Sequence, residues 1–389
     1  MTEPAGFSFS TVPNIICAPG ASRQLGRQLR QQFGTVAKRV LLVTDAGFLG
    51  TGLVQPVIDS LEAEQFTVTI FSDVLADPPE AVVLQAVADA RATGIDLVIG
   101  LGGGSSMDVA KLIAVLTPGT QALAAIYGIG NVSGSRLPLV QIPTTAGTGS
   151  EVTPIAIVTT GATAKMGVVA PQLNADLAVL DAELTLGLPP KTTAATGIDA
   201  MVHAIEAYTS KLKKNPLSDM LARQALSLLS ANLITACEDG RNLAARQAML
   251  LGAMLAGQAF ANAPVAAVHA LAYPIGGHFH VPHGLSNSLV LPHVLRFNAP
   301  VAAGHYAELA AIVAPSASGS TEARSEALIA AMERIAQRVG IATRLREVGI
   351  GAADLERLAD DAMLQTRLLG NNPRELTRAD AHAIYAAAL

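Results

Sequence analysis

The chain has 389 residues, of which 50% are hydrophobic and 15% are charged, with a formal net charge of −5 at pH 7. This composition excludes a disordered protein, and the length fits two domains better than one. The negative charge, without any lysine- or arginine-rich run, argues against a nucleic-acid partner. Cys17 and Cys237 lie far apart and have no metal-type spacing, so we expect a reducing, cytoplasmic location.

Short apolar runs alternate with helical patterns in the first part of the chain. Strands are predicted at 39–44, 66–71, 97–101 and 139–142, and helices near 52–64, 79–93 and 106–116. Such alternation is typical of a parallel sheet with helices on both faces. We therefore predict an α/β, Rossmann-like domain over residues 1–190.

After Thr192 the pattern changes to alanine- and leucine-rich segments with helical periodicity, as at 219–231 and 326–336. The double proline at 189–190 suits a connection between domains. We therefore predict a second, all-helical domain over residues 191–389.

One long stretch of the second part, from Gln247 to Leu295, has no charged side chain. It is rich in alanine and glycine and contains Gln258, Asn262 and Pro264. These residues favour buried helices of a helical domain over a membrane span.

A glycine run follows the predicted strand at 97–101. Gly102, Gly103 and Gly104 precede Ser105 and a predicted helix. Glycines let a phosphate approach the backbone, and the N–H groups of a helix N-terminus favour an anion. The run is not the dinucleotide fingerprint G-x-G-x-x-G, so a tight turn remains an equal alternative.

A second loop, after the strand at 139–142, places hydroxyl side chains around two glycines. Its members include Thr144, Thr145 and Thr148. A capped turn would use the same residue types. However, two such loops after successive strands predict a nucleotide site at the carboxyl ends of the strands.

Asp45 directly follows the strand at 39–44. A carboxylate there can accept hydrogen bonds from a ribose diol and would repel a 2′-phosphate, so NAD is favoured over NADP. The alternative is an ordinary helix-capping aspartate.

All eight histidines lie between His203 and His382. Asp199 and His203 are four residues apart, so on a helix they project from one face, and His269 and His283 are candidates to complete a metal shell. One oxygen and three nitrogen ligands suit Fe²⁺ or Zn²⁺ rather than Ca²⁺ or Mg²⁺. His278 and His280, in the same segment, are alternative ligands, substrate contacts or proton carriers.

Together these residues resemble the iron-containing (group III) alcohol dehydrogenases. The resemblance covers nearly the whole chain and is carried by the segments at 102–105, 143–153, 197–208, 282–284 and 372–374. It implies a dehydroquinate synthase-like architecture, in which a Rossmann-like domain binds NAD(P) and a helical domain holds the metal in the cleft between them. It also implies a homodimer or larger homo-oligomer.

By the same resemblance, Asp199, His203, His269 and His283 are the metal ligands, and the spacing of fourteen between the last two is kept. The glycine loop would bind pyrophosphate, the three threonines would line the cofactor site, and Lys165 would lie near it.

The chain departs from the family pattern at Tyr273, where many members have a second histidine close to the nicotinamide. A phenol is a poorer base than imidazole at neutral pH. Tyr273, His278 and His280 are therefore the candidate proton-relay residues, and the substrate is predicted only as a small alcohol or aldehyde.

The expected reaction is hydride transfer between an alcohol and NAD, with the metal as a Lewis acid. The alternatives are an oxoacid–hydroxyacid transhydrogenase-like enzyme, a dehydroquinate synthase-like or glycerol dehydrogenase-like relative, and a catalytically silent nucleotide- or metal-binding protein.

Overall fold

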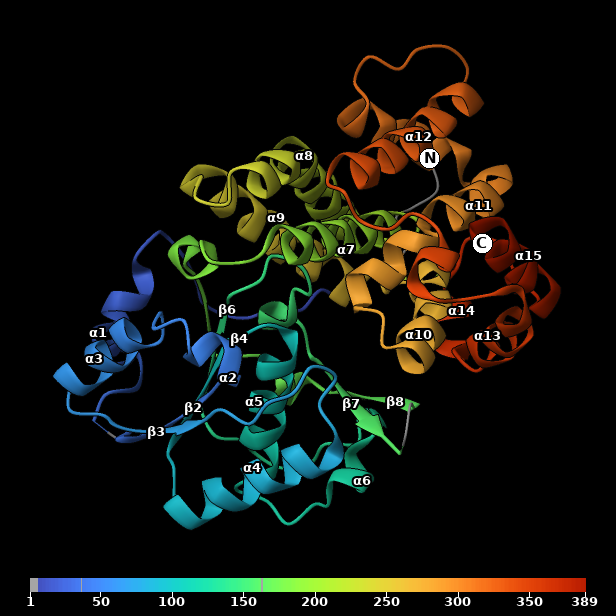
Figure 1. Ribbon diagram of the computed structural model, residues 1–389. Helices are drawn as coiled ribbons and strands as arrows, with labels where there is room; N and C mark the ends of the chain where they lie inside the picture. The colour runs from blue at the N-terminus through green and yellow to red at the C-terminus, as the bar shows by residue number, and fades with distance from the viewer. Residues whose placement is uncertain (1–5, 36, 162–163) are drawn as a thin grey trace. The chain divides into compact units, whose positions relative to one another are not determined.

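The structure is a computed structural model that describes residues 6–35, 37–161 and 164–389. The chain forms two compact units (Figure 1). Thr11–Leu188 make the first unit, and Pro189–Leu389 together with residues 6–10 make the second. The second unit begins at the double proline, where Pro189 is the N-cap of a helix and Pro190 is its first residue, a position that suits the fixed φ of proline.

A parallel sheet of six strands forms the centre of the first unit, in the order β1-β9-β6-β4-β2-β3. The strands are β1 (Ile15–Cys17), β2 (Arg39–Val43), β3 (Thr67–Phe71), β4 (Leu97–Gly102), β6 (Leu139–Pro143) and β9 (Leu177–Leu180). The four predicted strands correspond to β2, β3, β4 and β6.

Helices cover both faces of this sheet, because alternate residues of each strand point to opposite sides. On one face, Leu42 and Ile99 belong to a hydrophobic cluster that also contains Leu29 and Leu61 from two helices. On the other face, α5 packs so closely that a Cβ on Gly100 would lie 2.9 Å from the Cβ of Ala110. The helices are α1 (Leu25–Phe33), α2 (Ala46–Leu49), α3 (Gln55–Ala63), α4 (Glu80–Thr93), α5 (Gly104–Leu116) and α6 (Leu123–Ile126).

A small sheet accompanies the main one. Strand β7 (Ile155–Thr160) pairs antiparallel with β8 (Ala164–Val169), and β5 (Gly128–Ile129) pairs parallel with β8. These strands were not predicted, although residues 155–158 of β7 form a short apolar run; in β8, Lys165 and Gly167 interrupt the apolar residues, and most residues of both strands are only partly buried.

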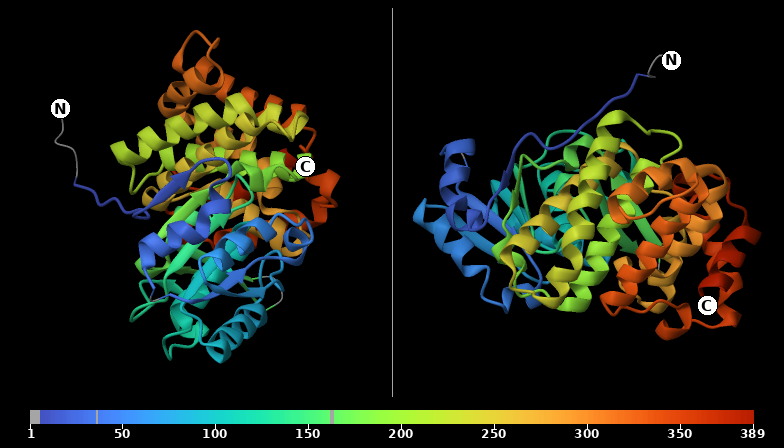
Figure 2. Two further views of the ribbon diagram at one scale, coloured as in Figure 1. Left: turned by 90° about the vertical axis from the view of Figure 1, so that its left-hand side faces the viewer. Right: turned by 90° about the horizontal axis from the view of Figure 1, so that it is seen from above.

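The second unit is helical. Helices α7, α8 and α9 pack side by side (Figures 1 and 2). Their contact depends on Gly197 of α7, where a Cβ would lie 2.5 Å from Leu233 and 2.8 Å from Met249. The helices are α7 (Pro190–Tyr208), α8 (Pro216–Glu238), α9 (Leu243–Asn262), α10 (Ala267–Phe279), α11 (His283–Val313), α12 (Thr321–Arg338), α13 (Leu355–Met363), α14 (Thr366–Leu369) and α15 (Arg378–Ala388). The predicted fold class, an α/β part followed by an all-α part, is confirmed.

The uncharged stretch from Gln247 to Leu295 forms most of α9, all of α10 and the start of α11, and many of its residues are buried. Within the described ranges, no single helix has both the length and the apolar character to cross a membrane. Helices α9 and α10 are long and apolar enough only when they are taken together, and a bend of 107° separates them.

Candidate metal and cofactor sites

Three loops that carry predicted cofactor residues lie at one edge of the main sheet. They follow β2, β4 and β6, which are neighbours in the strand order. The register pairs Gly102 with Pro143, so the loops after β4 and β6 begin side by side. The carboxyl ends of parallel strands meet at one edge, and that edge is where open α/β sheets bind ligands.

The glycine loop and the threonine loop are in direct contact. The N–H of Thr144 donates to the carbonyl of Gly102 at 2.9 Å. A Cβ on Gly104 would lie 2.8 Å from the methyl carbon of Thr148, and one on Gly103 would lie 3.7 Å from that of Thr145. Glycine is therefore required at position 104 by the neighbouring loop, whether or not a ligand is bound.

The glycine loop ends in the first turn of α5. Gly103 is the N-cap, and Gly104 and Ser105 are the first two helical residues. Among the described residues, no side chain caps this turn. The N–H groups of a first turn lack partners within the helix and attract an anion.

Asp45 caps a helix and also lies close to the glycine loop. It is the N-cap of α2, and its Oδ1 accepts the N–H of Phe48 at 2.8 Å. Its Oδ2 lies 3.6 Å from the position that a Cβ on Gly102 would occupy. The carboxylate thus lies beside the glycine loop while it caps the helix.

Lys165 has different neighbours. Its Nζ lies 2.6 Å from Oδ1 of Asp77 and donates to Oγ1 of Thr159 at 3.1 Å. These contacts hold its amino group against Asp77 and the β7–β8 hairpin.

A buried lysine that the sequence reasoning missed holds the threonine loop on α5. Nζ of Lys111 is fully buried and donates to Oγ of Ser150 at 2.7 Å and to the carbonyl of Ile155 at 2.6 Å. Oγ of Ser150 in turn donates to Asp108 at 2.6 Å. Burial lowers the pKa of Lys111. The signal in the sequence was a lysine three residues after an aspartate within an otherwise apolar helix.

Glu151 follows Ser150 and is also buried. Burial raises the pKa of its carboxyl group to about 7, against the opposing effects of its own backbone and of Lys111.

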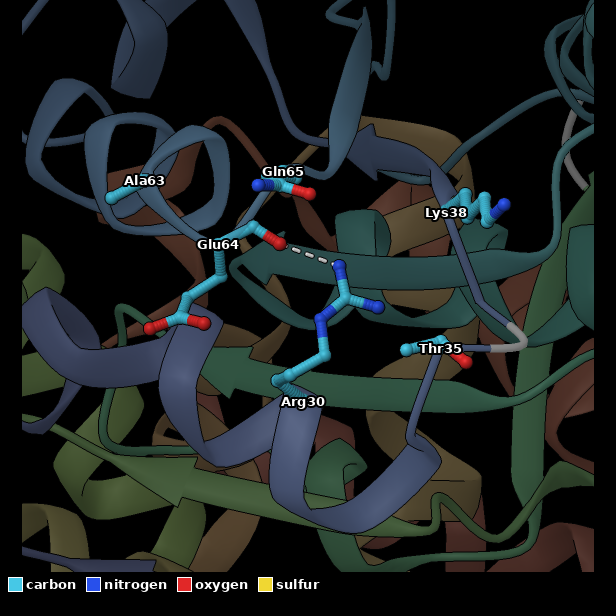
Figure 3. A pocket seen from close by; sticks show the side chains of 6 residues that line it. All are labelled: Arg30, Thr35, Lys38, Ala63, Glu64 and Gln65. Carbon is cyan, nitrogen blue, oxygen red and sulfur yellow. Dashed lines mark hydrogen bonds between the residues drawn. The ribbon is translucent and has the colours of Figure 1, made fainter.

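A surface pocket of about 420 Å³ lies elsewhere on this unit (Figure 3). Its lining includes Lys38 and Gln65, which precede β2 and β3, so it lies at the edge opposite the three loops. Its Arg30 donates to the carbonyls of Gly34, Ala37 and Glu64. The guanidinium of Arg30 is therefore bound to backbone carbonyls. Because the pocket lies at the opposite edge of the sheet, it does not belong to the cofactor site.

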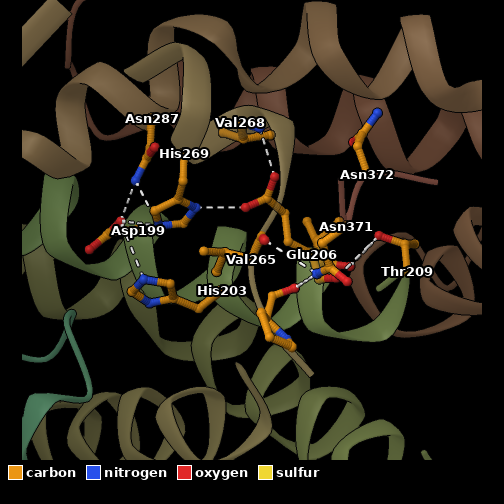
Figure 4. Close-up of polar contacts among 12 residues, drawn as sticks. Asp199, His203, Glu206, Thr209, Val265, Val268, His269, Asn287, Asn371 and Asn372 are labelled. Carbon is orange, nitrogen blue, oxygen red and sulfur yellow. Dashed lines mark hydrogen bonds and ion pairs between the residues drawn. The ribbon is translucent and has the colours of Figure 1, made fainter. Parts of the chain in front are cut away.

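The second unit brings the four predicted metal ligands together. Asp199 and His203 project from α7 and His269 from α10 (Figure 4). His283 is the first residue of α11. Oδ1 of Asp199 lies 4.0 Å from Nε2 of His203, 3.8 Å from that of His269 and 3.7 Å from that of His283. The ligand atoms of the first three residues all lie within 4.8 Å of one another.

These separations fit a shared ion better than direct hydrogen bonds. Two ligand atoms held at about 2.1 Å on one tetrahedral ion lie about 3.4 Å apart. The side chains of Asp199, His203 and His269 are at most 6% exposed, whereas that of His283 is 40% exposed. Burial alone would raise the pKa of Asp199, but the three imidazoles lower it below its ordinary value.

Two further residues complete this cluster, and sequence reasoning missed both. Asn287 donates from Nδ2 to Oδ1 of Asp199 at 2.6 Å, and the same nitrogen lies 3.3 Å from Nε2 of both His269 and His283. Oε2 of Glu206 lies 2.6 Å from Nδ1 of His269. Their spacing was the available signal, since Asn287 comes one turn after His283 and Glu206 comes two turns after Asp199.

The three proposed proton-relay residues lie at different places along α10. The ring centroid of Tyr273 lies 5.8 Å from that of His283. Nε2 of His278 lies 2.5 Å from Asp361. His280 is the C-cap of α10, in a left-handed conformation with a φ of 53°, and is exposed. The structure thus brings Tyr273 to the ligand cluster and places the two histidines at the end of the helix.

Family models match both units of the chain. The model described as iron-containing alcohol dehydrogenase matches residues 13–182, and the model described as the C-terminal part of the Fe-containing alcohol dehydrogenase family matches residues 193–389.

Individual relatives are similar to this chain over most of their length. Long-chain-alcohol dehydrogenase 1 of Geobacillus thermodenitrificans is 43% identical over 359 residues, which are 90% of each chain. An NAD-dependent methanol dehydrogenase of Bacillus methanolicus is 35% identical and covers 98% of this chain and 100% of its own. The crystal structure of a 1,3-propanediol oxidoreductase superposes with a TM-score of 0.95 at 34% identity, covering 99% of this chain and 100% of its own.

We expect Gly104→Ala to weaken binding of NAD, the cofactor predicted from the sequence, by at least about tenfold. The added methyl would push against Thr148 and separate the two loops, and crowding of this kind costs about 1–3 kcal/mol. Binding can be followed by the fluorescence of NADH. Gly187→Ala is the matched control, because a Cβ there meets nothing within 4 Å. Equal NADH affinity in the two variants would contradict the inferred loop contact.

We expect Glu151→Gln to stabilise the protein at alkaline pH. The folded-state pKa of Glu151 is raised from 4.5 to about 7, so the unfolded chain loses this proton first and stability falls as the pH rises from 4.5 to 7. Glutamine does not ionise, so the stability of the variant does not fall in this way. Its unfolding free energy should match the wild type near pH 4.5 and exceed it by up to about 3 kcal/mol at pH 8. A difference between variant and wild type that does not change with pH in chemical unfolding experiments would refute this.

Proposed function

The chain belongs to the iron-containing alcohol dehydrogenase family, and we propose that it is an iron-dependent, NAD-linked enzyme that interconverts a small alcohol and its aldehyde or ketone. The observation that carries the proposal is the convergence of Asp199, His203, His269 and His283 from three helices of the second unit.

The donor set fits a divalent transition metal. Three imidazole nitrogens and one carboxylate oxygen suit Fe²⁺, with Zn²⁺ as the alternative. Asp199 is buried, and an ion shared with the three imidazoles would compensate its negative charge. We therefore propose these four residues as the metal ligands.

The first unit supplies the proposed NAD site. The first turn of α5, with Gly103, Gly104 and Ser105, would hold the pyrophosphate, and Thr144, Thr145 and Thr148 would line the adjoining wall. Asp45 would bind the adenosine ribose, consistent with the NAD dependence of the methanol dehydrogenase relative. Lys165 would have to give up its contacts with Asp77 and Thr159 before its amino group could bind the cofactor.

A metal ion held by Asp199, His203, His269 and His283 would supply Lewis-acid chemistry toward the substrate oxygen, and NAD held by the first unit would supply the hydride acceptor or donor. The protein's own residues position these groups and handle the proton. Tyr273 lies beside His283 and can donate a hydrogen bond to the substrate oxygen. His278 and His280 would act farther along the proton path, and His278 would have to exchange its contact with Asp361 to do so.

The substrate class is a small alcohol or aldehyde. Relatives named for long-chain alcohols, methanol and 1,3-propanediol are 43%, 35% and 35% identical to the chain, and all three names refer to alcohol oxidation. We further propose that the enzyme works in the cytoplasm as a homodimer or larger homo-oligomer. Neither cysteine forms a disulfide in the described part of the chain, in keeping with a reducing compartment.

Replacement of His283 tests the metal ligands. We expect His283→Ala, prepared anaerobically with Fe²⁺, to lose bound iron. The kcat/KM of alcohol-dependent NADH formation should fall by more than about 100-fold, because loss of a ligand should cost more than loss of a residue that only supports a ligand. His382→Ala is the control, since its imidazole lies on the surface near Glu356. A His283→Ala variant with wild-type iron content and activity would show that the ligand assignment is wrong.

Replacement of Asp45 tests the choice of cofactor. We expect Asp45→Asn to retain the cap on α2, because an amide oxygen can still accept from Phe48, while it removes the negative charge that repels a 2′-phosphate. The ratio of kcat/KM for NADP⁺ to that for NAD⁺ should rise by about tenfold or more. An unchanged ratio would place the adenosine ribose elsewhere.

A further inference from the structure

Glu206 links the ligand cluster to the start of α10. Its side chain is buried on α7, where Oε1 accepts the N–H of Val268 at 2.7 Å and Oε2 lies 2.6 Å from Nδ1 of His269 (Figure 4). One carboxylate therefore holds both the backbone that leads into His269 and the ring of His269 itself.

This contact determines which ring nitrogen of His269 carries the proton. An ionised carboxylate has only acceptors, so Nδ1 must be the donor and Nε2 must keep its lone pair. Nε2 lies 3.8 Å from Oδ1 of Asp199. The amide nitrogen of Asn287 donates to Asp199 and also lies 3.3 Å from this Nε2, which agrees with an acceptor at that position.

Glu206 also supplies a cap that α10 lacks in its own sequence. The N-cap residue of α10 is Ala266, which has no side chain able to accept a first-turn N–H. The carboxylate of Glu206, which belongs to α7, accepts this N–H instead, and its negative charge is favourable at a helix N-terminus. His269 is in the same first turn, so the cap and the ligand are positioned together.

The bend before α10 has a second, independent anchor. Nδ2 of Asn371 donates to the carbonyls of Pro264 and Val265, and its Oδ1 accepts from Ser210 at 2.9 Å. The path of the backbone therefore has support besides Glu206. The orientation and protonation of the His269 ring depend on Glu206 itself.

We propose that Glu206 is a positioning residue that fixes the Nδ1–H form of His269 and thereby sets how tightly the site retains a divalent metal. The inference rests on the proposed function, because it requires the four-ligand site to bind the ion. A carboxylate on the far nitrogen of a ligating imidazole fixes its orientation and raises its basicity, and loss of such a partner costs 10–100-fold in metal affinity.

Glu206→Gln is the decisive variant because it changes the pattern of donors with little change in shape. If the amide oxygen accepts from Val268, the amide NH₂ faces Nδ1 of His269 and favours the opposite tautomer, with the proton on Nε2. We expect Fe²⁺ and Zn²⁺, in anaerobic competition with a chelator, to bind about 10–100-fold more weakly than to the wild type. Glu308→Gln is the matched control, since this helical glutamate binds the hydroxyl of Tyr208 instead.

A second measurement uses the metal-free wild-type protein with ¹⁵N-labelled histidine. Nitrogen chemical shifts at pH 8.5 should show the proton of His269 on Nδ1, with the signals identified by their loss in His269→Gln. In Glu206→Gln the proton should move to Nε2. This measurement needs no bound metal and no activity. The wild-type spectrum alone shows which nitrogen of His269 carries the proton, even if the variant does not fold.

The outcomes separate the two proposals. A wild type that retains no metal overturns the proposed function. A wild type that binds metal but carries the His269 proton on Nε2 overturns the role of Glu206, as does a folded Glu206→Gln variant with wild-type metal affinity.

Discussion

The second unit is organised around one buried carboxylate. Oδ1 of Asp199 has three imidazole nitrogens within 4.0 Å, and they come from three separate helices. A buried charge without compensation would be costly, so α7, α10 and α11 must converge closely enough to surround it. Gly284 makes this approach possible, because a Cβ there would collide with the backbone carbonyl of Ala195 and lie 3.1 Å from the Cβ of Asp199. The Pro-His-Gly sequence at 282–284 thus carries a ligand and, directly after it, the residue that lets that ligand reach the carboxylate.

In the first unit, a buried lysine lies beside the proposed NAD site. There, two backbone loops must lie against each other and still leave N–H groups for an anion. The glycines allow the approach, and the buried amino group of Lys111 holds the far side of the threonine loop through Ser150 and Ile155. A lysine suits this task because its three N–H donors can bind several acceptors at once, as an apolar side chain could not.

Sequence patterns were sufficient where the physical signal is local. The apolar runs of β2, β4 and β6 and the i, i+4 pair of Asp199 and His203 can be recognised in short windows. The fold expected from the apolar runs and the family expected from the resemblance are both confirmed. The β7–β8 hairpin was not predicted: β7 has a short apolar run at 155–158, but Lys165 and Gly167 break the pattern of β8, and both strands are mostly only partly buried. Contacts such as Glu206 with His269 and His278 with Asp361 join residues 63 and 83 positions apart, so only the packing of helices reveals them.

The four proposed ligands differ most in their access to solvent. The side chain of His283 is 40% exposed, whereas the other three are nearly inaccessible. An ion would therefore enter and leave on the His283 side, with this imidazole the last to bind and the first to release. The first step of metal release would then depend on the fluctuations of one residue at the start of α11, while the equilibrium affinity depends on all four ligands.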